Sequence, residues 1–120
     1  SLEQFGVTPW DGFYFGMHNG SAFAQRNRYY QGRLYDAVCN GGITTLSRSG
    51  HVIFRSNIPA RFRHFVYDTR SCSVTVTAPQ EGWVEFPNLT PRQILVNGES
   101  IASAEMVHIS VGVSTIQFIL

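Results

Sequence analysis

Hydrophobic and polar residues alternate along the chain from residue 43 onward, in short runs that turn-forming residues interrupt. The clearest run is 73–77, where Val74 and Val76 alternate with Ser and Thr residues. A period of two places successive side chains on opposite faces of a β-strand, so that one face is buried and the other is polar. The pattern therefore predicts strands at residues 43–46, 51–55, 62–67, 73–77, 83–86, 93–96, 106–110 and 114–120.

The first 42 residues are less regular, and their pattern predicts strands at 12–17 and 21–26. Asn19-Gly20 and Asn97-Gly98 are expected hairpin turns, because both residue types tolerate the positive φ angles of a type I′ turn. No stretch shows the period of a helix. A chain of 120 residues suits one core of ordinary size. We therefore expect residues 1–120 to form a single all-β domain, a two-sheet antiparallel β-sandwich of the jelly-roll or immunoglobulin-like type.

Charged residues are scarce and dispersed. They make up 14% of the chain, whereas a typical globular protein has about 25%. All nine basic residues are Arg, scattered between positions 26 and 92, and the net charge is +1. Nucleic acids and anionic membranes are bound through a concentrated basic surface. Neither is an expected partner, and a neutral polar ligand or a neighbouring protein fits the composition better.

Two features favour an extracellular, secreted protein. Cys39 and Cys72 are the right number for one disulfide bond, which is typical of oxidising compartments. Asn19-Gly20-Ser21 and Asn88-Leu89-Thr90 have the pattern of N-glycosylation sites. The alternative is that both cysteines are buried free thiols and that both glycosylation patterns arise by chance.

Aromatic and arginine residues gather in the N-terminal third, and they are the first candidates for a binding site. Sugars present flat CH faces beside a rim of hydroxyls, and sites for them combine aromatic platforms with planar polar groups such as guanidinium. The alternative is that the tyrosines anchor loops by their hydroxyls while neighbouring Phe residues fill the core. The residues predicted to bind a ligand here are Trp10, Tyr14, Arg26, Tyr29 and Tyr30.

Trp83 is a second candidate platform. If Val84 and Phe86 face inward, the alternation places Trp83 and Glu85 on the outer face of the sheet, where an exposed indole can bind a ligand. If the register is reversed, Trp83 belongs to the core.

The run 61–66 contains a pair of arginines at the spacing of one strand face. Strict alternation places Arg61 and Arg63 on the same face as Phe65. Two such guanidinium groups can hold a carboxylate, for example that of a uronic acid, through bidentate hydrogen bonds. The alternative is a solvated face on which they pair with an acidic residue such as Glu85.

The sequence contains no motif that supports metal binding or catalysis. Zinc sites normally use closely spaced pairs of ligands, and the sequence has no such pair among its histidines, which are His18, His51, His64 and His108. No Ser or Cys has the context of a known nucleophile motif, and the acidic residues are scattered. We expect no metal, no cofactor and no catalytic activity.

The last 40 residues resemble a known class of domain. The segments Trp83-Val84-Glu85-Phe86, Val96-Asn97-Gly98 and Ser114-Thr115-Ile116 are similar to the closing strands of accessory β-sandwich domains, carbohydrate-binding-module-like, in secreted carbohydrate-active enzymes. The resemblance covers about a third of the chain. It implies a non-catalytic domain that binds a polysaccharide or oligosaccharide, or one that packs against a neighbouring catalytic domain.

The sequence ends in the apolar residues Phe118, Ile119 and Leu120 without a polar tail, and we expect the domain to be a module of a longer chain. A third hypothesis is a viral or phage surface domain that assembles into an oligomer through its sheet edges.

Overall fold

The structure is a computed structural model that describes residues 7–8, 12–13, 15–16 and 23–120. These residues contain strands and connecting turns, and no helix long and apolar enough to cross a membrane occurs among them. The strands are β1 (Val7–Thr8), β2 (Gly12–Phe13), β3 (Phe15–Gly16), β4 (Phe23–Tyr30), β5 (Arg33–Asn40), β6 (Ile43–Arg48), β7 (His51–Ser56), β8 (Arg61–Tyr67), β9 (Ser71–Ala78), β10 (Gly82–Glu85), β11 (Gln93–Val96), β12 (Glu99–Ile101), β13 (Val107–Ile109) and β14 (Gly112–Ile119).

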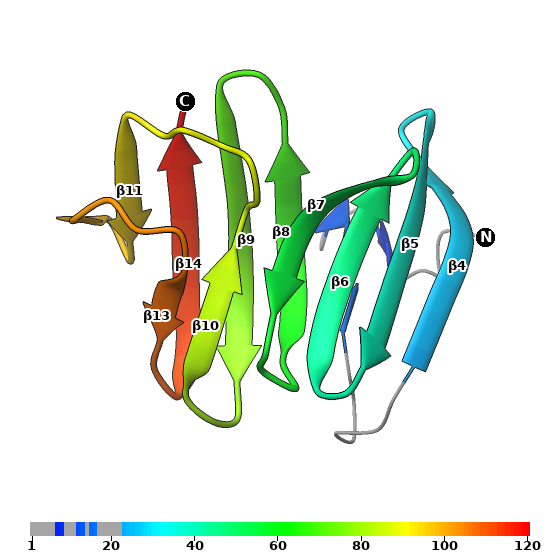
Figure 1. The fold of residues 1–120 in the computed structure, drawn as a ribbon, viewed down its shortest axis with the longest axis horizontal. Coiled ribbons are helices and arrows are strands. Elements are labelled where there is room, and N and C mark those ends of the chain that lie inside the picture. The colour runs from blue at the N-terminus through cyan, green and yellow to red at the C-terminus, as the bar shows by residue number, and fades with distance from the viewer. Residues whose placement is uncertain (1–6, 9–11, 14, 17–22) are drawn as a thin grey trace.

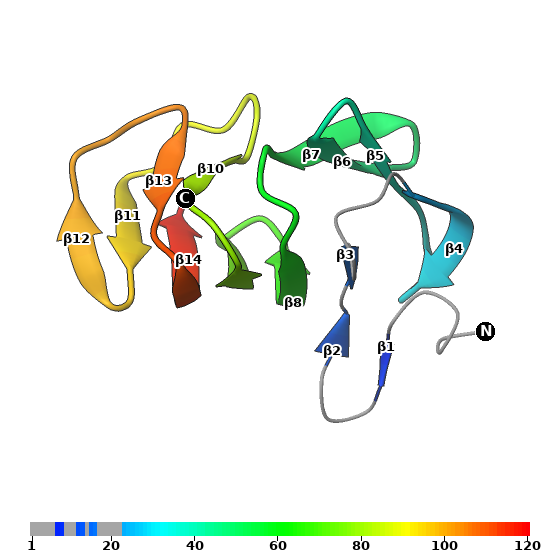
Figure 2. The same ribbon diagram turned by 90° about the horizontal axis from the view of Figure 1, so that it is seen from below.

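Two antiparallel six-stranded sheets pack face to face, which confirms the predicted β-sandwich (Figure 1). The front sheet has the order β13-β10-β7-β6-β5-β4, and the back sheet has the order β12-β11-β14-β9-β8-β3. Figure 2 shows the sheets as separate layers, with β4 bending toward the small β1–β2 ribbon. In the front sheet, β4 to β7 follow one another as a meander, and β10 then adds beside β7.

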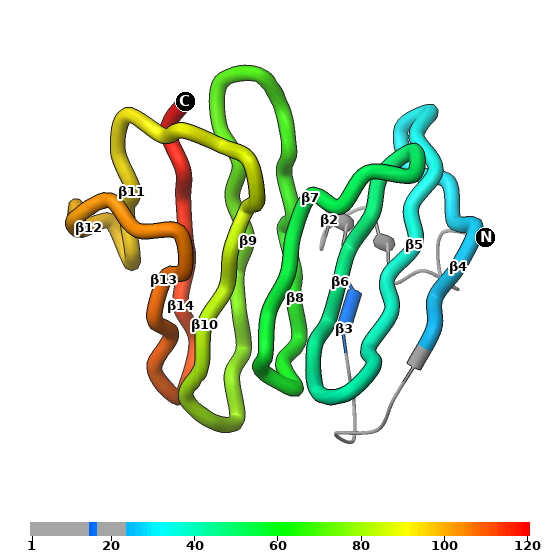
Figure 3. The backbone as a smooth tube through the Cα atoms, in the orientation of Figure 1, coloured from blue at the N-terminus to red at the C-terminus, as the bar shows by residue number. Residues whose placement is uncertain are grey.

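The C-terminal half of the chain crosses repeatedly between the sheets, as the tube in Figure 3 shows. It leaves β10 for β11, returns from β12 to β13, and finally enters β14 in the back sheet. There β14 pairs with β11 on one side and with β9 along eight residues on the other. The last strand is therefore internal to its sheet, and both of its edges are hydrogen-bonded.

A cluster of phenylalanine rings joins the two sheets at the centre of the core. Phe54 of β7 is fully buried, and its ring lies 5.1–5.8 Å, centroid to centroid, from Phe15, Phe62, Phe65 and Phe86. Most of these ring pairs meet edge to face, the arrangement that aromatic quadrupoles favour.

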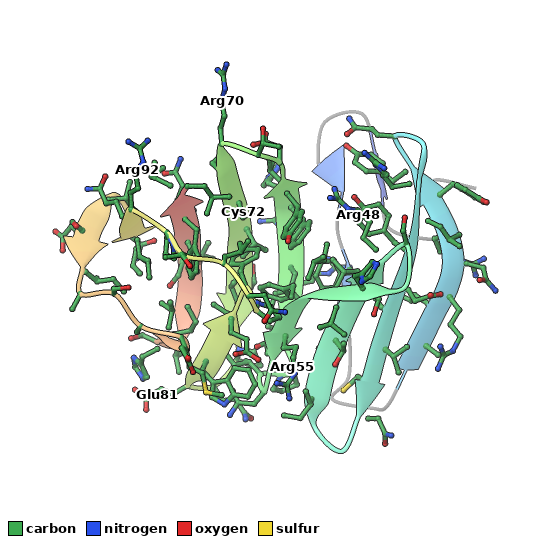
Figure 4. All side chains as sticks on the ribbon, turned by 45° about the horizontal axis from the view of Figure 1, so that its top comes forward. Arg48, Arg55, Arg70, Cys72, Glu81 and Arg92 are labelled. Carbon is green, nitrogen blue, oxygen red and sulfur yellow. The ribbon has the colours of Figure 1, made fainter. Side chains whose placement is uncertain are left out.

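Arg48 links the sheets beside this cluster. Its guanidinium lies 4.7 Å above the ring centre of Tyr67 and donates a hydrogen bond of 3.1 Å to the Tyr67 carbonyl oxygen (Figure 4). Since Arg48 belongs to β6 and Tyr67 to β8, this contact connects the two layers directly.

The strands predicted from residue 43 onward are confirmed, with each end within two residues of its predicted position. Among the earlier predictions, 21–26 falls on β4, although residues 21–22 lie outside the described part of the chain, and 12–17 includes the short strands β2 and β3. The pattern did not predict β1, β5 or β12.

A β-bulge in β8 overturns the predicted assignment of its two faces. The pairing of β8 with β9 shifts between Arg63 and Val66, and His64 adopts a φ of 50°. The extra residue reverses the alternation after it, so both Phe62 and Phe65 point into the core. Phe65 therefore does not share a face with the arginines, and Val66 lies outside instead.

The predicted disulfide bond between Cys39 and Cys72 is wrong. Both cysteines are buried free thiols, Cys39 on β5 of the front sheet and Cys72 on β9 of the back sheet. Burial raises the pKa of the Cys72 thiol to about 11, and its sulfur lies 4.0 Å from the carbonyl oxygen of Asp68. The number of cysteines cannot reveal that their strands belong to different sheets.

Candidate functional site

Trp83 lies on the outer face of the front sheet, in the orientation that alternation predicts for inward-facing Val84 and Phe86. Those two side chains are buried, with exposed fractions of 0% and 3%. Trp83 is half-buried, and it pairs with His108 of the edge strand β13. The indole is therefore accessible from outside the sandwich.

Arg55 and Glu85 form an ion pair beside this indole. The two residues lie directly opposite each other on β7 and β10, and Arg55 Nη1 is 2.7 Å from Glu85 Oε1. The same guanidinium lies 5.8 Å from the centre of the Trp83 ring. The Glu85 side chain is 12% exposed and that of Arg55 is 40% exposed, so the carboxylate is largely withdrawn from water while the guanidinium can contact a ligand.

Backbone contacts fix β10 firmly against the end of β7. The Trp83 carbonyl oxygen accepts a 2.7 Å hydrogen bond from Ser56 Oγ, and the Trp83 amide donates a 2.8 Å bond to Asn57 Oδ1. Gly82 allows this approach, because a Cβ atom at residue 82 would collide with Asn57 Oδ1 and with the buried Ile58 side chain. The position of the indole is thus set by the packing of the strand that carries it.

A cleft of about 700 Å³ opens next to the ion pair. Arg55 and Glu85 form one wall, and the other walls come from two crossover loops, residues 86–91 between β10 and β11 and residues 103–105 between β12 and β13. Phe86 and Phe118, whose ring centres are 4.9 Å apart, close the bottom. The polar side chains on the rim are Asn88, Thr90, Ser103 and Glu105, in addition to Arg55 and Glu85.

This arrangement offers hydrogen bonds rather than reactive groups. An arginine carries five N–H donors in a fixed plane, and Arg55 directs one nitrogen to Glu85. Glu105 lines the same cleft, but Glu85 is already engaged by the guanidinium. Among the described residues, no group of three or more His, Cys, Asp or Glu side chains could hold a metal ion. The cleft is suited to holding a neutral polar molecule.

The residues predicted to bind a ligand do not form one site. Arg26, Tyr29 and Tyr30 lie on β4, at the opposite edge of the front sheet from β10, with three strands between them. At the usual spacing, Trp83 is about 19 Å from them across the sheet. Trp10 and Tyr14 lie outside the described residues.

The three predicted residues on β4 also differ in their surroundings. Tyr29 is 68% exposed and Arg26 is exposed, whereas Tyr30 packs against the core. Asn27 takes a φ of 57°, and the pairing with β5 shifts between Gln25 and Arg28, so β4 does not present a regular face.

Neither the Arg55–Glu85 pair nor the loop walls of the cleft could be predicted from the sequence. The two paired residues are 30 positions apart, and their proximity depends on the pairing of β7 with β10. Pro87, Asn88 and Pro91 marked a connection between strands, but their residue types do not reveal that it borders a cleft.

Comparison with known proteins found no matching family model, no similar curated sequence and no similar solved structure.

Proposed function

We propose that this domain is a non-catalytic accessory module of an extracellular carbohydrate-active protein, and that it binds a polysaccharide at the cleft beside Trp83. The proposal rests on one arrangement: the Arg55 guanidinium lies 5.8 Å from the accessible indole of Trp83, and its ion pair with Glu85 forms one wall of the polar-rimmed cleft.

Each part of the arrangement matches a feature of a sugar chain. The indole offers an apolar face to sugar CH groups. Arg55 and Glu85 provide oriented donors and acceptors for hydroxyls, and the pair is neutral as a whole. A volume of about 700 Å³ lies within the range of small-ligand sites in proteins. The rim residues from both crossover loops extend the contact along a polymer rather than enclosing a single molecule.

An interaction domain is the alternative that a specific observation favours. Val111 and Val113 are 64% and 62% exposed at the start of β14. Exposed apolar side chains close together favour packing against a neighbouring domain. In that case the cleft would have no ligand, and binding experiments with polysaccharides would separate the two functions.

Affinity electrophoresis of the whole domain in gels that contain neutral polysaccharides tests the proposal. We expect at least one polysaccharide to retard the wild-type protein, Trp83→Ala to abolish the retardation and Asn88→Ala to weaken it. Tyr29→Ala is the matched control, because it removes an exposed aromatic ring at the far edge of the same sheet.

The controls make each outcome decisive, provided that circular dichroism shows all variants folded. If Tyr29→Ala abolishes retardation and Trp83→Ala does not, the cleft is the wrong site. If no neutral polysaccharide retards the wild-type protein, the proposed function is refuted and packing against a neighbour is favoured.

A further inference from the structure

On β8, β9 and β14, the outer face of the back sheet is rich in hydroxyl groups, and the charged residues on it are arginines. Along β9 the even-numbered residues are buried, so the odd-numbered ones face outward, and β14 alternates in the same way. Several side chains point outward from β8 before its bulge and from the neighbouring parts of β9 and β14. They are Arg61, Arg63, Ser73, Thr75, Thr77, Val113, Thr115 and Gln117. The described part of these three strands places no acidic side chain on this face.

Three of these side chains form a row across the strands. Arg63 pairs with Thr75, and Thr75 pairs with Thr115. The two threonine hydroxyl oxygens are 3.5 Å apart, with Thr115 exposed and Thr75 half-buried. At the spacing of neighbouring strands the row extends for about 10 Å. It presents a guanidinium followed by two adjacent hydroxyls on a flat surface.

Arg63 has unused hydrogen-bonding capacity. Its Nε atom is buried and has no hydrogen-bond partner in the described part of the chain. Glu85 was the acidic residue expected as a possible ion-pair partner of Arg63, but it lies on the opposite sheet and pairs with Arg55. The buried Nε is out of reach of a ligand, but the Arg63 side chain is only half-buried. A carboxylate would therefore bind the two terminal nitrogens of the guanidinium.

We propose that this face is a second binding surface, specific for a polyuronate chain. A uronate carboxylate binds the fork of Arg63, and sugar hydroxyls exchange hydrogen bonds with Thr75 and Thr115. Arg61 lies on the same face, about 6.8 Å away along β8. The surface lies on the opposite sheet from the cleft and does not require the cleft to bind sugar.

The chemistry of the face separates a polyuronate from other anionic partners. Nucleic acids require a concentrated basic surface, whereas here two arginines stand among neutral side chains in a protein of net charge +1. A carboxylate matches the planar fork of arginine. Threonine hydroxyls both donate and accept hydrogen bonds, as the hydroxyls of a sugar ring require.

Affinity electrophoresis of the whole domain with polygalacturonate tests this surface, with methyl-esterified polygalacturonate as the matched ligand that lacks the charge. We expect polygalacturonate to retard the wild-type protein and the ester to do so at least tenfold less strongly. Arg63→Gln is expected to weaken binding of polygalacturonate about tenfold, the factor that corresponds to 1.4 kcal/mol. Thr115→Val is expected to weaken it less, while preserving a β-branched residue on the strand.

Two further variants test whether binding depends on the planar guanidinium of Arg63 rather than on positive charge in general. Arg63→Lys keeps the charge but loses the planar fork, so its affinity is expected to lie between those of wild type and Arg63→Gln. Arg70→Gln removes the same charge from an exposed arginine that projects away from the face (Figure 4), and we expect less than a twofold change.

Several results would overturn the inference: no retardation by polygalacturonate, equal retardation by the ester, or equal losses in Arg63→Gln and Arg70→Gln. Trp83→Ala separates this surface from the cleft, because it should abolish binding of neutral polysaccharides and leave polygalacturonate binding unchanged. Failure of the neutral ligands alone would refute the cleft, and failure of polygalacturonate alone would refute this face.

Discussion

The Arg55–Glu85 ion pair can be tested as a structural element of the cleft by a double-mutant cycle. Glu85 is 12% exposed and Arg55 is 40% exposed, so the pair lies between a surface pair and a buried one. Surface pairs contribute up to about 1 kcal/mol, and removing one partner of a buried pair costs about 3–5 kcal/mol. Because water can reach the arginine but hardly the carboxylate, we expect Arg55→Met to lower the free energy of unfolding by about 2 kcal/mol.

The partner variant and the double variant complete the cycle. Glu85→Gln keeps the shape of the side chain and leaves the guanidinium half-exposed, so its cost should be smaller, about 1.5 kcal/mol. The double variant should lose less than the sum of the two, giving a coupling energy of about 1 kcal/mol. Part of the Arg55 cost comes from its contact with the Trp83 ring, which remains in Glu85→Gln.

Urea unfolding followed by tryptophan fluorescence measures these free energies. The slope of the unfolding curve should be the same in all four proteins, since the variants change no buried apolar surface of consequence. Repeating the cycle at high salt should leave most of the coupling, because a withdrawn carboxylate is poorly screened. A coupling below about 0.3 kcal/mol, or one that salt removes, would show a solvated pair and refute its role as a fixed wall of the cleft.

Three further changes follow from local packing. Burial raises the pKa of Cys72 to about 11, and Cys39 is also buried. We therefore expect neither thiol to react with iodoacetamide in the native protein and both to react in urea. A change of electrophoretic mobility on reduction would contradict the free thiols. Gly82→Ala should destabilise the domain by about 1–3 kcal/mol in urea unfolding, because its Cβ would meet the Asn57 side chain. Thr44→Val should raise the melting temperature by a few degrees, because the Thr44 hydroxyl is buried without a partner; an unchanged or lower value would show that this hydroxyl is satisfied.

Period-two alternation predicts strands well where each face has one chemical character. In β9, Val74 and Val76 face the core while hydroxyl residues face outward, so the pattern and the structure agree. In β5 the inward residues are Tyr35, Ala37 and Cys39, but the outward face includes Leu34 and Val38. Apolar residues on both faces conceal the alternation, and the strand was not predicted.

The assignment of faces fails where one residue is inserted into a strand. The bulge at His64 reverses every later side chain of β8 and brings Phe65 into the core. Histidine tolerates a positive φ better than most residues, but no neighbouring Gly or Asn marks the position. A bulge is specified by the pairing of two strands rather than by the residue itself, so a single strand does not disclose it.

The site shows the same division between local and long-range information. Alternation within β10 left two registers for Trp83, and the burial of Val84 in the structure selects the one with Trp83 outside. The partnership of Glu85 with Arg55 depends on the register of β10 against β7, and the separation of Trp83 from Tyr29 depends on the order of strands in the sheet. Both are properties of the assembled fold, and hydrophobic pattern does not encode either.

The exclusive use of arginine among the basic residues has a physical explanation in the described contacts. Arg48 combines a face contact with the Tyr67 ring and a hydrogen bond to its carbonyl oxygen, and Arg55 combines a ring contact with an ion pair to Glu85. Both contacts need a planar cation with several directed donors, which a lysine ammonium does not provide. Arg63 has the same planar fork, and its buried Nε has no acceptor among the residues that the structure describes. Arg28 of β4 also has a buried Nε without a partner among the described residues. Arg63, however, stands in a row with the hydroxyls of Thr75 and Thr115, and this row is the reason to seek its partner outside the domain.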